Sequence, residues 1–341
     1  MALKPPVEVP QGAIRLNTDS QKLEFFAQDQ WWEMATDVPY LGNATNSDIA
    51  GGVRAVYCNG STPTALNTSR YFTIATQGDS VDFGTLTRTV FNTPASFSDR
   101  TRGVIMGGSD PSATSTSDTI TISSTGSAVG GFVTLQSNLK EHGGCSNATR
   151  GIRFGGGSGT TSVDYSTIAS GGTQVDFGTF RGGEQNMGAA SPTRGLLGRG
   201  NDSGLQAGVD LITIASTGNA EVFGDLTIAR YGGASASSST RAVFAGGWAS
   251  PLTPRIDSFE IASTGNAEVF GDLTVARYGM SNCGASDNIR GMFMGGHRNP
   301  NPQTDVVDYI TFATRGNAVD FGNLDAVKHG GAAVSNGHGG L

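Results

Sequence analysis

The sequence predicts an all-β fold of about six repeated four-stranded units behind a short N-terminal β-hairpin. Three observations lead to this expectation. A unit of 44 to 51 residues recurs along the chain, its segments are short runs of β-branched and aromatic residues between Gly, Ser, Thr and Asn turns, and the long 3.6-residue apolar period of a helix does not appear. We expect the hairpin in residues 1–37 and the repeats in residues 38–341.

The repeat is clearest in two copies that start 47 residues apart. Residues 214–232 read IASTGNAEVFGDLTIARYG, and residues 261–279 differ from them only by Val275 in place of Ile228. Six copies can be placed, each with an opening arginine and the phenylalanine of a Phe-Gly step, which reads Phe-Val in the second copy. The arginines are Arg54, Arg102, Arg150, Arg194, Arg241 and Arg290, and the phenylalanines are Phe83, Phe132, Phe177, Phe223, Phe270 and Phe321. Such a period is typical of repeat architectures.

Each unit contains four short segments that have the composition of strands. One copy supplies AVFAGG, SFEIAS and AEVFGDL together with the small-residue segment YGGASAS. Four strands in this period fit a blade of a β-propeller better than a helical repeat. We expect the small-residue segment to be the innermost strand, because backbones approach one another most closely around a central channel.

The order of these segments resembles the kelch repeat family, whose blades carry a double glycine at the end of the second strand. The corresponding pairs here are Gly107-Gly108, Gly155-Gly156, Gly246-Gly247 and Gly295-Gly296. The Tyr and Trp that pack between kelch blades are largely missing, and we expect the phenylalanine of the Phe-Gly step to fill that layer. The resemblance implies a six-bladed propeller of four-stranded antiparallel blades.

The last repeat runs on into a further small-residue segment. Residues 327–340 read VKHGGAAVSNGHGG and have no second strand after them. We expect this segment to insert into the first blade and close the ring.

Before the repeats, residues 13–17 and 22–27 read AIRLN and KLEFFA and are separated by a polar turn. This pattern predicts a β-hairpin, followed by Trp31 and Trp32. Its layout, Pro-x-Gly-x-Ile-Arg, a turn, an apolar strand and then Trp, resembles short hairpins of phage tail-fibre and appendage proteins and, more loosely, the trimerising hairpin of phage fibritin. The resemblance implies that this hairpin attaches the protein to a partner or trimerises it. The alternative is that the hairpin folds back onto the propeller. The expected contact residues are Ile14, Leu23, Phe25, Trp31 and Trp32.

Composition excludes several classes of function. The 22 basic and 29 acidic residues give a net charge of −7, which argues against a nucleic-acid partner. No apolar run reaches the roughly 18 residues of a spanning helix, and the first residues lack the apolar core of a signal peptide. Cys58, Cys145 and Cys283 are far apart and odd in number, so we expect buried thiols made in a reducing cytoplasm.

The recurring arginines invite comparison with sialidases, which hold a carboxylate with an arginine cluster, but the S-x-D-x-G-x-T-W box of that family is missing. Repetition in every blade instead indicates a framework role. Five aspartates recur at the start of the third strand, and we expect them to accept hydrogen bonds from these arginines in a structural ladder. The ladder would contain Arg102, Arg150, Arg194, Arg241 and Arg290 with Asp118, Asp164, Asp210, Asp257 and Asp308.

No catalytic, cofactor-binding or metal-binding set stands out. His142, His297, His329 and His338 lack the spacing of a metal cage, although His142 and His329 recur before a Gly-Gly on the inner strand and are candidates to line the channel. The histidine, tyrosine and cysteine set of kelch copper oxidases cannot be assembled, and no Ser-His-Asp set or phosphate loop appears. We therefore expect a protein without cofactor and without enzymatic activity.

The loops after the Gly-Gly pairs differ in length and content, whereas the turn near Ser-Thr-Gly-Asn barely changes. A scaffold with one variable face is typical of binding platforms. The candidate contact residues in these loops are Trp248, Pro251, His297, Arg298 and Asn299.

The favoured function is therefore a phage virion structural protein, a fibre, appendage or decoration component assembled in the host cytoplasm. It would contact other virion proteins and a host-surface glycan or protein, as a homo-oligomer, with a trimer favoured, and without membrane insertion. The alternatives are a glycan-binding, lectin-like propeller and, third, a propeller enzyme.

Overall fold

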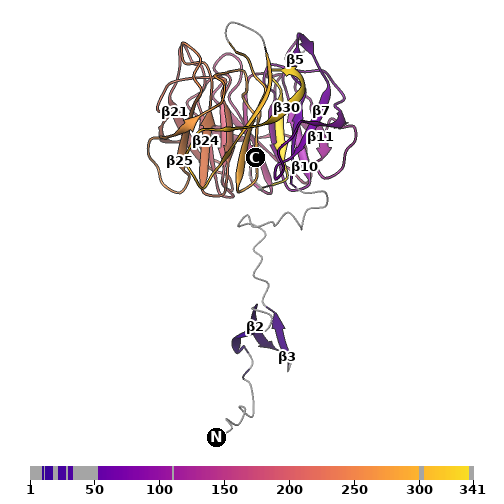
Figure 1. The fold of residues 1–341 in the computed structure, drawn as a ribbon, viewed down its shortest axis with the longest axis vertical. Coiled ribbons are helices and arrows are strands. Elements are labelled where there is room, and N and C mark those ends of the chain that lie inside the picture. Colours follow the sequence, from indigo (N-terminus) through magenta and orange to yellow (C-terminus); the bar gives the residue numbers. More distant parts are fainter. Residues whose placement is uncertain are drawn as a thin grey trace. The chain divides into compact units, whose positions relative to one another are not determined.

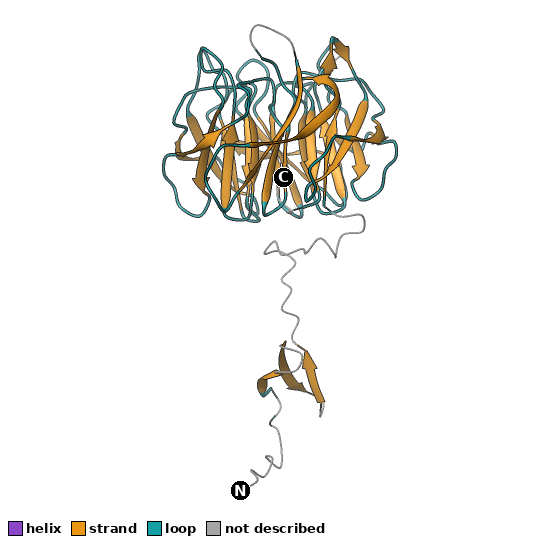
Figure 2. Cartoon of the chain, viewed as in Figure 1, coloured by secondary structure: helices purple, strands orange, loops and turns teal. Residues whose placement is uncertain are grey.

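The computed structural model describes Pro10 and residues 12–17, 22–27, 30–33, 53–109, 111–298 and 303–337. These residues form strands and loops without a helix (Figure 2). No helix among them is therefore long and apolar enough to cross a membrane. The chain divides into two compact units, residues 1–43 and 44–341, which we describe separately. The expected domain boundary after residue 37 lies outside the described residues.

The N-terminal unit is a three-stranded antiparallel sheet rather than a hairpin alone. Its strands are β1 (Ile14–Asn17), β2 (Lys22–Ala27) and β3 (Gln30–Glu33), in that order. The third strand carries both tryptophans, with Trp32 opposite Phe25 and Trp31 opposite Phe26. The sequence-based expectation stopped at the second strand because QWWE is short and lacks the alternation of polar and apolar residues that marks a strand.

The second unit contains six four-stranded antiparallel sheets (Figure 1), which we number 1 to 6 and give from their first to their fourth strand. Sheet 1 is β31 (Ala332–Ser335), β4 (Arg54–Cys58), β7 (Thr68–Thr73) and β8 (Val81–Thr85). Sheet 2 is β9 (Ala95–Ser98), β10 (Arg102–Met106), β11 (Ser117–Thr121) and β12 (Val129–Gly130). Sheet 3 is β14 (Gly143–Ser146), β15 (Arg150–Phe154), β16 (Ser162–Thr167) and β18 (Val175–Thr179).

Sheet 4 is β19 (Met187–Ala190), β20 (Arg194–Gly198), β21 (Gly208–Thr213) and β22 (Glu221–Asp225). Sheet 5 is β23 (Ala234–Ser237), β24 (Arg241–Ala245), β25 (Arg255–Glu260) and β26 (Glu268–Asp272). Sheet 6 is β27 (Gly284–Ser286), β28 (Arg290–Met294), β29 (Thr304–Thr311) and β30 (Val319–Lys328). Two small pairs complete the unit, β5 (Ser61–Thr62) with β6 (Thr64–Ala65) and β13 (Val133–Thr134) with β17 (Gly172–Thr173).

The first strands of the six sheets contact one another in the order β9, β14, β19, β23, β27 and β31, and β31 contacts β9 again. These are the small-residue segments, so the expectation that they lie innermost is confirmed. Serine hydroxyls join neighbours: Ser286 donates to the Ser237 carbonyl and Ser335 donates to the Ser286 carbonyl. Only small side chains permit this approach, and the result is a closed, propeller-like ring of sheets.

Ring closure uses the segment that the sequence indicated. Strand β31 pairs antiparallel with β4, and Ala332 lies opposite Cys58. Sheet 1 thus combines the last described strand with three early ones. All three cysteines are free and buried, as expected, and burial raises the pKa of each thiol to about 12.

The phenylalanines of the Phe-Gly steps pack between sheets. Phe321 of sheet 6 lies 5.8 Å from Phe72 of sheet 1, measured between ring centroids, and Phe223 of sheet 4 lies 5.6 Å from Phe259 of sheet 5. The following glycine is needed because a Cβ on Gly271 would collide with the carbonyl of Gly316 in the next sheet. The backbone hydrogen bond from Gly316 N to Phe270 O, 3.0 Å long, fixes the same approach. This contact explains why the Ser-Thr-Gly-Asn turn barely varies.

The six opening arginines form a framework between sheets by donating to backbone carbonyls of the next sheet, and Arg241 additionally pairs with Glu260 of its own sheet. Arg194 Nη1 donates to Ile261 O and Ala262 O at 2.9 and 2.8 Å, at the end of the third strand of the next sheet. Arg290 closes the series by donating to Ile74 O and Ala75 O of sheet 1. Equivalent bonds run from Arg54 to Ile122, from Arg102 to Ile168, from Arg150 to Ile214 and from Arg241 to Phe312.

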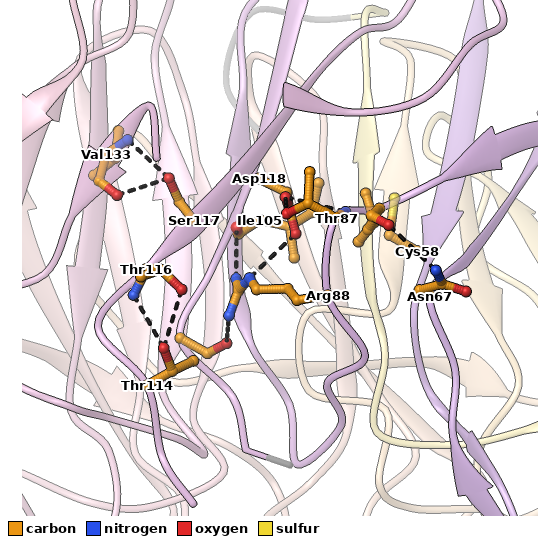
Figure 3. Close-up of polar contacts among 12 residues, drawn as sticks. Cys58, Asn67, Thr87, Arg88, Ile105, Thr114, Thr116, Ser117, Asp118 and Val133 are labelled. Atoms are coloured by element: carbon orange, nitrogen blue, oxygen red, sulfur yellow. Dashed lines mark hydrogen bonds and ion pairs between the residues drawn. The ribbon is translucent and has the colours of Figure 1, made fainter. Parts of the chain in front are cut away.

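The expected pairing of these arginines with the recurring aspartates is therefore wrong. Asp257 and Asp308 pair instead with Arg230 and Arg277, which lie in the connections that lead from the fourth strand of one sheet to the next sheet. Asp118 likewise pairs with Arg88 at 3.1 Å and accepts from Thr87 (Figure 3). The aspartates are framework residues of a second set of links. The remaining pairs are Asp210 with Arg181 and, within sheet 3, Asp164 with Arg153.

Candidate functional site at the mouth of the ring

Six connections meet around the axis of the ring, each just before an inner strand. Backbone hydrogen bonds of 2.7 to 3.1 Å join them in a closed circle. The bonds run from Glu141 N to Asn92 O, Gln185 N to Glu141 O, Gly232 N to Gln185 O, Met280 N to Gly232 O, Gly330 N to Gly279 O and Thr93 N to Gly330 O. The circle lies on the face of the variable loops, since Tyr231 pairs with Trp248, and Tyr278 with His297.

At a matching position, each connection places one residue of the circle in the left-handed region of φ, and in the first connection the neighbouring Thr93 adopts it as well, with φ of 45°. Three of these residues are glycines: Gly232, Gly279 and Gly330, with φ of 67°, 68° and 65°. The other three carry side chains: Asn92, Glu141 and Gln185, with φ of 57°, 60° and 52°. A side chain in this region costs of the order of 1 kcal/mol or more, and such strain concentrates at functional sites.

The ring is therefore asymmetric at this end of its axis, which we call the mouth. The three polar side chains come from consecutive connections and lie together on one side. Tyr278, His297 and His329 lie on the other side: the rings of Tyr278 and His297 are stacked with centroids 5.4 Å apart, and those of His297 and His329 are 3.7 Å apart. Trp248 packs edge-on against Tyr278. The two sides enclose a cavity of about 160 Å³, which Thr93 also lines.

Asn282 bridges the axis next to this circle. Its side-chain amide donates to Pro94 O and His142 O and accepts from Gly144 N, in or just before strands β9 and β14, whereas Asn282 itself lies just before β27. Asn282 is buried, so these hydrogen bonds hold three of the connections together beside the mouth.

Burial tunes the charges of the pocket. It raises the pKa of the Glu141 carboxyl, and the charge of nearby Glu184 adds to the rise while Lys140 opposes it. Burial, together with neighbouring His297, lowers the pKa of His329 to about 4, so His329 is neutral at pH 7. Two buried polar atoms of the lining make no hydrogen bond within the described part of the chain: Thr93 Oγ1 and His329 Nδ1. Groups of this kind normally have a partner.

The sequence-based contact residues fall partly at this site. Trp248 and His297 each pack against the ring of Tyr278, whereas Pro251 and Arg298 are exposed in the surrounding loops. Asn299 and His338 lie outside the described residues. His329 lines the mouth as expected, but His142 is fully buried behind it.

Asn92, Glu141, Gln185 and Tyr278 were missed. Tyr278 precedes β27 by six residues, whereas the first three precede their inner strands by two or three residues, at one matching position of the repeat. A comparison of the six repeats at that position would have revealed three glycines and three polar residues. Among the described residues, no group of three His, Cys, Asp or Glu side chains is arranged to hold a metal ion.

The N-terminal sheet carries a second candidate surface, separate from the ring. Cross-strand pairing places Ile14, Phe25 and Trp32 in one row, with exposed fractions of 63%, 36% and 44%. Trp31 belongs to the opposite face, where it packs against Phe26 and beneath the guanidinium of Arg15. Leu23 pairs with Leu16 in the register, but its side chain is outside the described part.

Comparisons with known proteins define a fold class and no family. No family model matches the chain, and no curated protein matches it. Among solved structures it is similar to YjhT, with a TM-score of 0.58 and 10% sequence identity over 73% of this chain and 88% of YjhT. At this identity the similarity concerns the fold alone. The chain is an all-β, propeller-like protein.

Proposed function

We propose that the chain is a six-bladed, kelch-like β-propeller that serves as a bacteriophage virion appendage protein. It attaches or trimerises through its N-terminal sheet and presents the mouth of the propeller to a host-surface glycan or protein, or to another virion protein. The exposed row of Ile14, Phe25 and Trp32 is the observation that carries this proposal. An exposed row of apolar side chains on a small sheet marks a surface that favours burial against a partner.

The propeller part of the proposal rests on the repeat. Six four-stranded sheets, a small-residue inner strand in each and paired glycines at the end of the second strand support a kelch-like ring. A binding role is favoured over catalysis because the repeated arginines and aspartates are engaged in contacts between and within sheets, and variation is concentrated in the loops of one face.

The test compares the solution mass of the full chain with that of a Phe25→Ser/Trp32→Ser variant by light scattering. We expect a trimer that falls to a monomer, because the double change removes two of the exposed apolar side chains of the row. Val222→Ser is the matched control, since Val222 is 63% exposed on the propeller and its loss should leave the mass unchanged.

A monomeric full chain would contradict oligomerisation. Immunogold labelling of purified phage particles tests the virion assignment, and absence of the protein from intact particles would contradict it. A stand-alone glycan-binding module is the second candidate, favoured by the mouth pocket. It predicts a monomer that still binds its ligand.

A further inference from the structure

The three polar residues of the mouth are retained at positions where glycine is the easier choice. The other three connections of the same circle use glycine at a similar φ, so the backbone itself does not require a side chain there. Asn92, Glu141 and Gln185 also come from neighbouring connections, which directs them to one pocket instead of spreading them around the axis. Retained strain of this kind indicates a use for the side chains.

The pocket offers both donors and acceptors of hydrogen bonds. The amides of Asn92 and Gln185 provide both, with one N–H of Asn92 already donating to Ser109 Oγ at 2.9 Å. The Glu141 carboxylate accepts, and Thr93 Oγ1 and His329 Nδ1 are buried without a partner among the described residues. Opposite them, Tyr278 contributes an aromatic ring packed against His297. A few polar groups facing an aromatic wall is the usual composition of a small-molecule site.

The size and charge of the pocket narrow the class of ligand. Its volume of about 160 Å³ is below the range of drug-sized sites, so only one small group enters. No Lys or Arg is among the residues that line it, and Glu141 would repel an anion. An ammonium group only donates hydrogen bonds, so it would leave the amide N–H groups of the pocket without acceptors. A hydroxyl both donates and accepts, so several hydroxyls on one ring match the lining best.

We propose that the mouth of the ring binds a single neutral sugar residue, the terminal group of a glycan, through Asn92, Glu141 and Gln185. This inference deepens the proposed function, because it names the chemistry of the surface that the propeller presents. The sugar hydroxyls bond to the three polar side chains, Thr93 and His329, and the carbon face of the ring lies toward Tyr278.

The test is saturation-transfer NMR on the full chain with small probes at millimolar concentration. The neutral probes are the methyl glycosides of glucose, galactose and N-acetylglucosamine, and the charged probes are glucuronate and glucosamine. We expect transfer to at least one neutral probe and weaker or no transfer to the charged ones. Binding of only a charged probe, or of none, would overturn the proposal.

Substitution by glycine locates the site without harming the fold. Gln185→Gly and Glu141→Gly remove the side chains while the backbone keeps a conformation that glycine prefers, so Tm should stay the same or rise. Each change should weaken binding of the neutral probe by about tenfold, the effect of losing one or two hydrogen bonds. Ser203→Gly is the control, because Ser203 is an exposed residue with φ of 53° away from the pocket and should leave binding unchanged.

Unchanged binding in both mouth variants would place the sugar elsewhere and overturn the assignment. Failure of this inference is distinguishable from failure of the appendage proposal. If the protein is a trimer present in particles but binds no probe, only the proposed sugar site is contradicted. If it is a monomer that is absent from particles but binds the probe through Gln185, only the proposed role as an appendage is contradicted.

Discussion

The interface between sheets 5 and 6 and the interface that closes the ring between sheets 6 and 1 carry opposite charges on the third strand. At the first, Arg277 in the connection pairs with Asp308 on the third strand. At the second, Arg70 takes the third-strand position and pairs with Asp325 of β30, at 2.8 Å. The positions are equivalent, because Asp308 lies opposite Phe293 and Arg70 lies opposite Tyr57, the fourth residue of the second strand in both sheets.

The third-strand charge is reversed between the two interfaces, yet it has a partner of opposite charge at both, so the repeats preserve complementarity between neighbours rather than a particular residue. The reversed charge distinguishes the closing interface from the others. Asp325 of β30 would meet a like charge on the third strand of sheets 2 to 6, each of which carries an aspartate there. Like charges in contact disfavour a wrong pairing, so β30 fits sheet 1 of its own chain best.

The two interfaces differ in burial, and the largest effect is expected at the buried one. Arg277 and Asp308 are fully buried, so Asp308→Ala leaves a buried guanidinium without its carboxylate. We expect the free energy of unfolding to fall by about 3–5 kcal/mol in chemical denaturation. The exposed pair of Arg315 and Glu268 provides the control, because Arg315→Ala should cost at most about 1 kcal/mol. Equal losses in the two variants would contradict a special role for burial.

At the outer edge the two interfaces are alike, and an intermediate effect is expected at both. A Cβ on Gly271 would collide with Gly316 O, and a Cβ on Gly322 would collide with Gly78 O across the closure. Alanine at either position should reduce the free energy of unfolding by about 1–3 kcal/mol. Gly265→Ala is the control, since nothing lies within 4 Å of its Cβ position. A neutral Gly322→Ala would show that the closing edge is looser than the internal one.

The smallest effect is expected at the closing ion pair, where it should depend on pH. Burial alone would raise the pKa of Asp325, but the hydrogen bond from Lys328 and the charges of Lys328 and Arg70 outweigh it and lower this pKa. A lowered pKa stabilises the fold above the unfolded value of about 4 and loses that contribution as pH falls below it. Asp325→Asn keeps an oxygen that accepts from the buried Lys328 Nζ and removes only the charge, so it should cost about 0.5–1 kcal/mol at pH 7 and nothing near pH 2. A difference that persists in acid would contradict this account.

Local pattern was enough to predict most of the fold. The strands, the innermost position of the Gly, Ala and Ser segments, the packing of Phe321 and the insertion of β31 into sheet 1 follow from composition and from the order of segments within a repeat. The third strand of the N-terminal sheet did not follow, because four residues with two adjacent tryptophans carry no periodic signal.

The partners of charged residues could not be predicted in this way. Arg290 and Arg277 are both near Asp308 in the repeat pattern, and only the path of the connection across the sheet decides that Arg277 reaches the carboxylate. The pocket at the mouth could not be predicted for a related reason. Asn92, Glu141 and Gln185 are far apart in the sequence, and only closure of the ring brings them to one pocket.

Strand β31 also determines when the ring of sheets can close during synthesis. During synthesis sheets 2 to 6 can be completed one after another, but sheet 1 lacks its inner strand until residues 332–335 have left the ribosome. Until then the edge of β4 stays unpaired. A chain that stops before β31 leaves this edge of the sheet open and exposed to proteases.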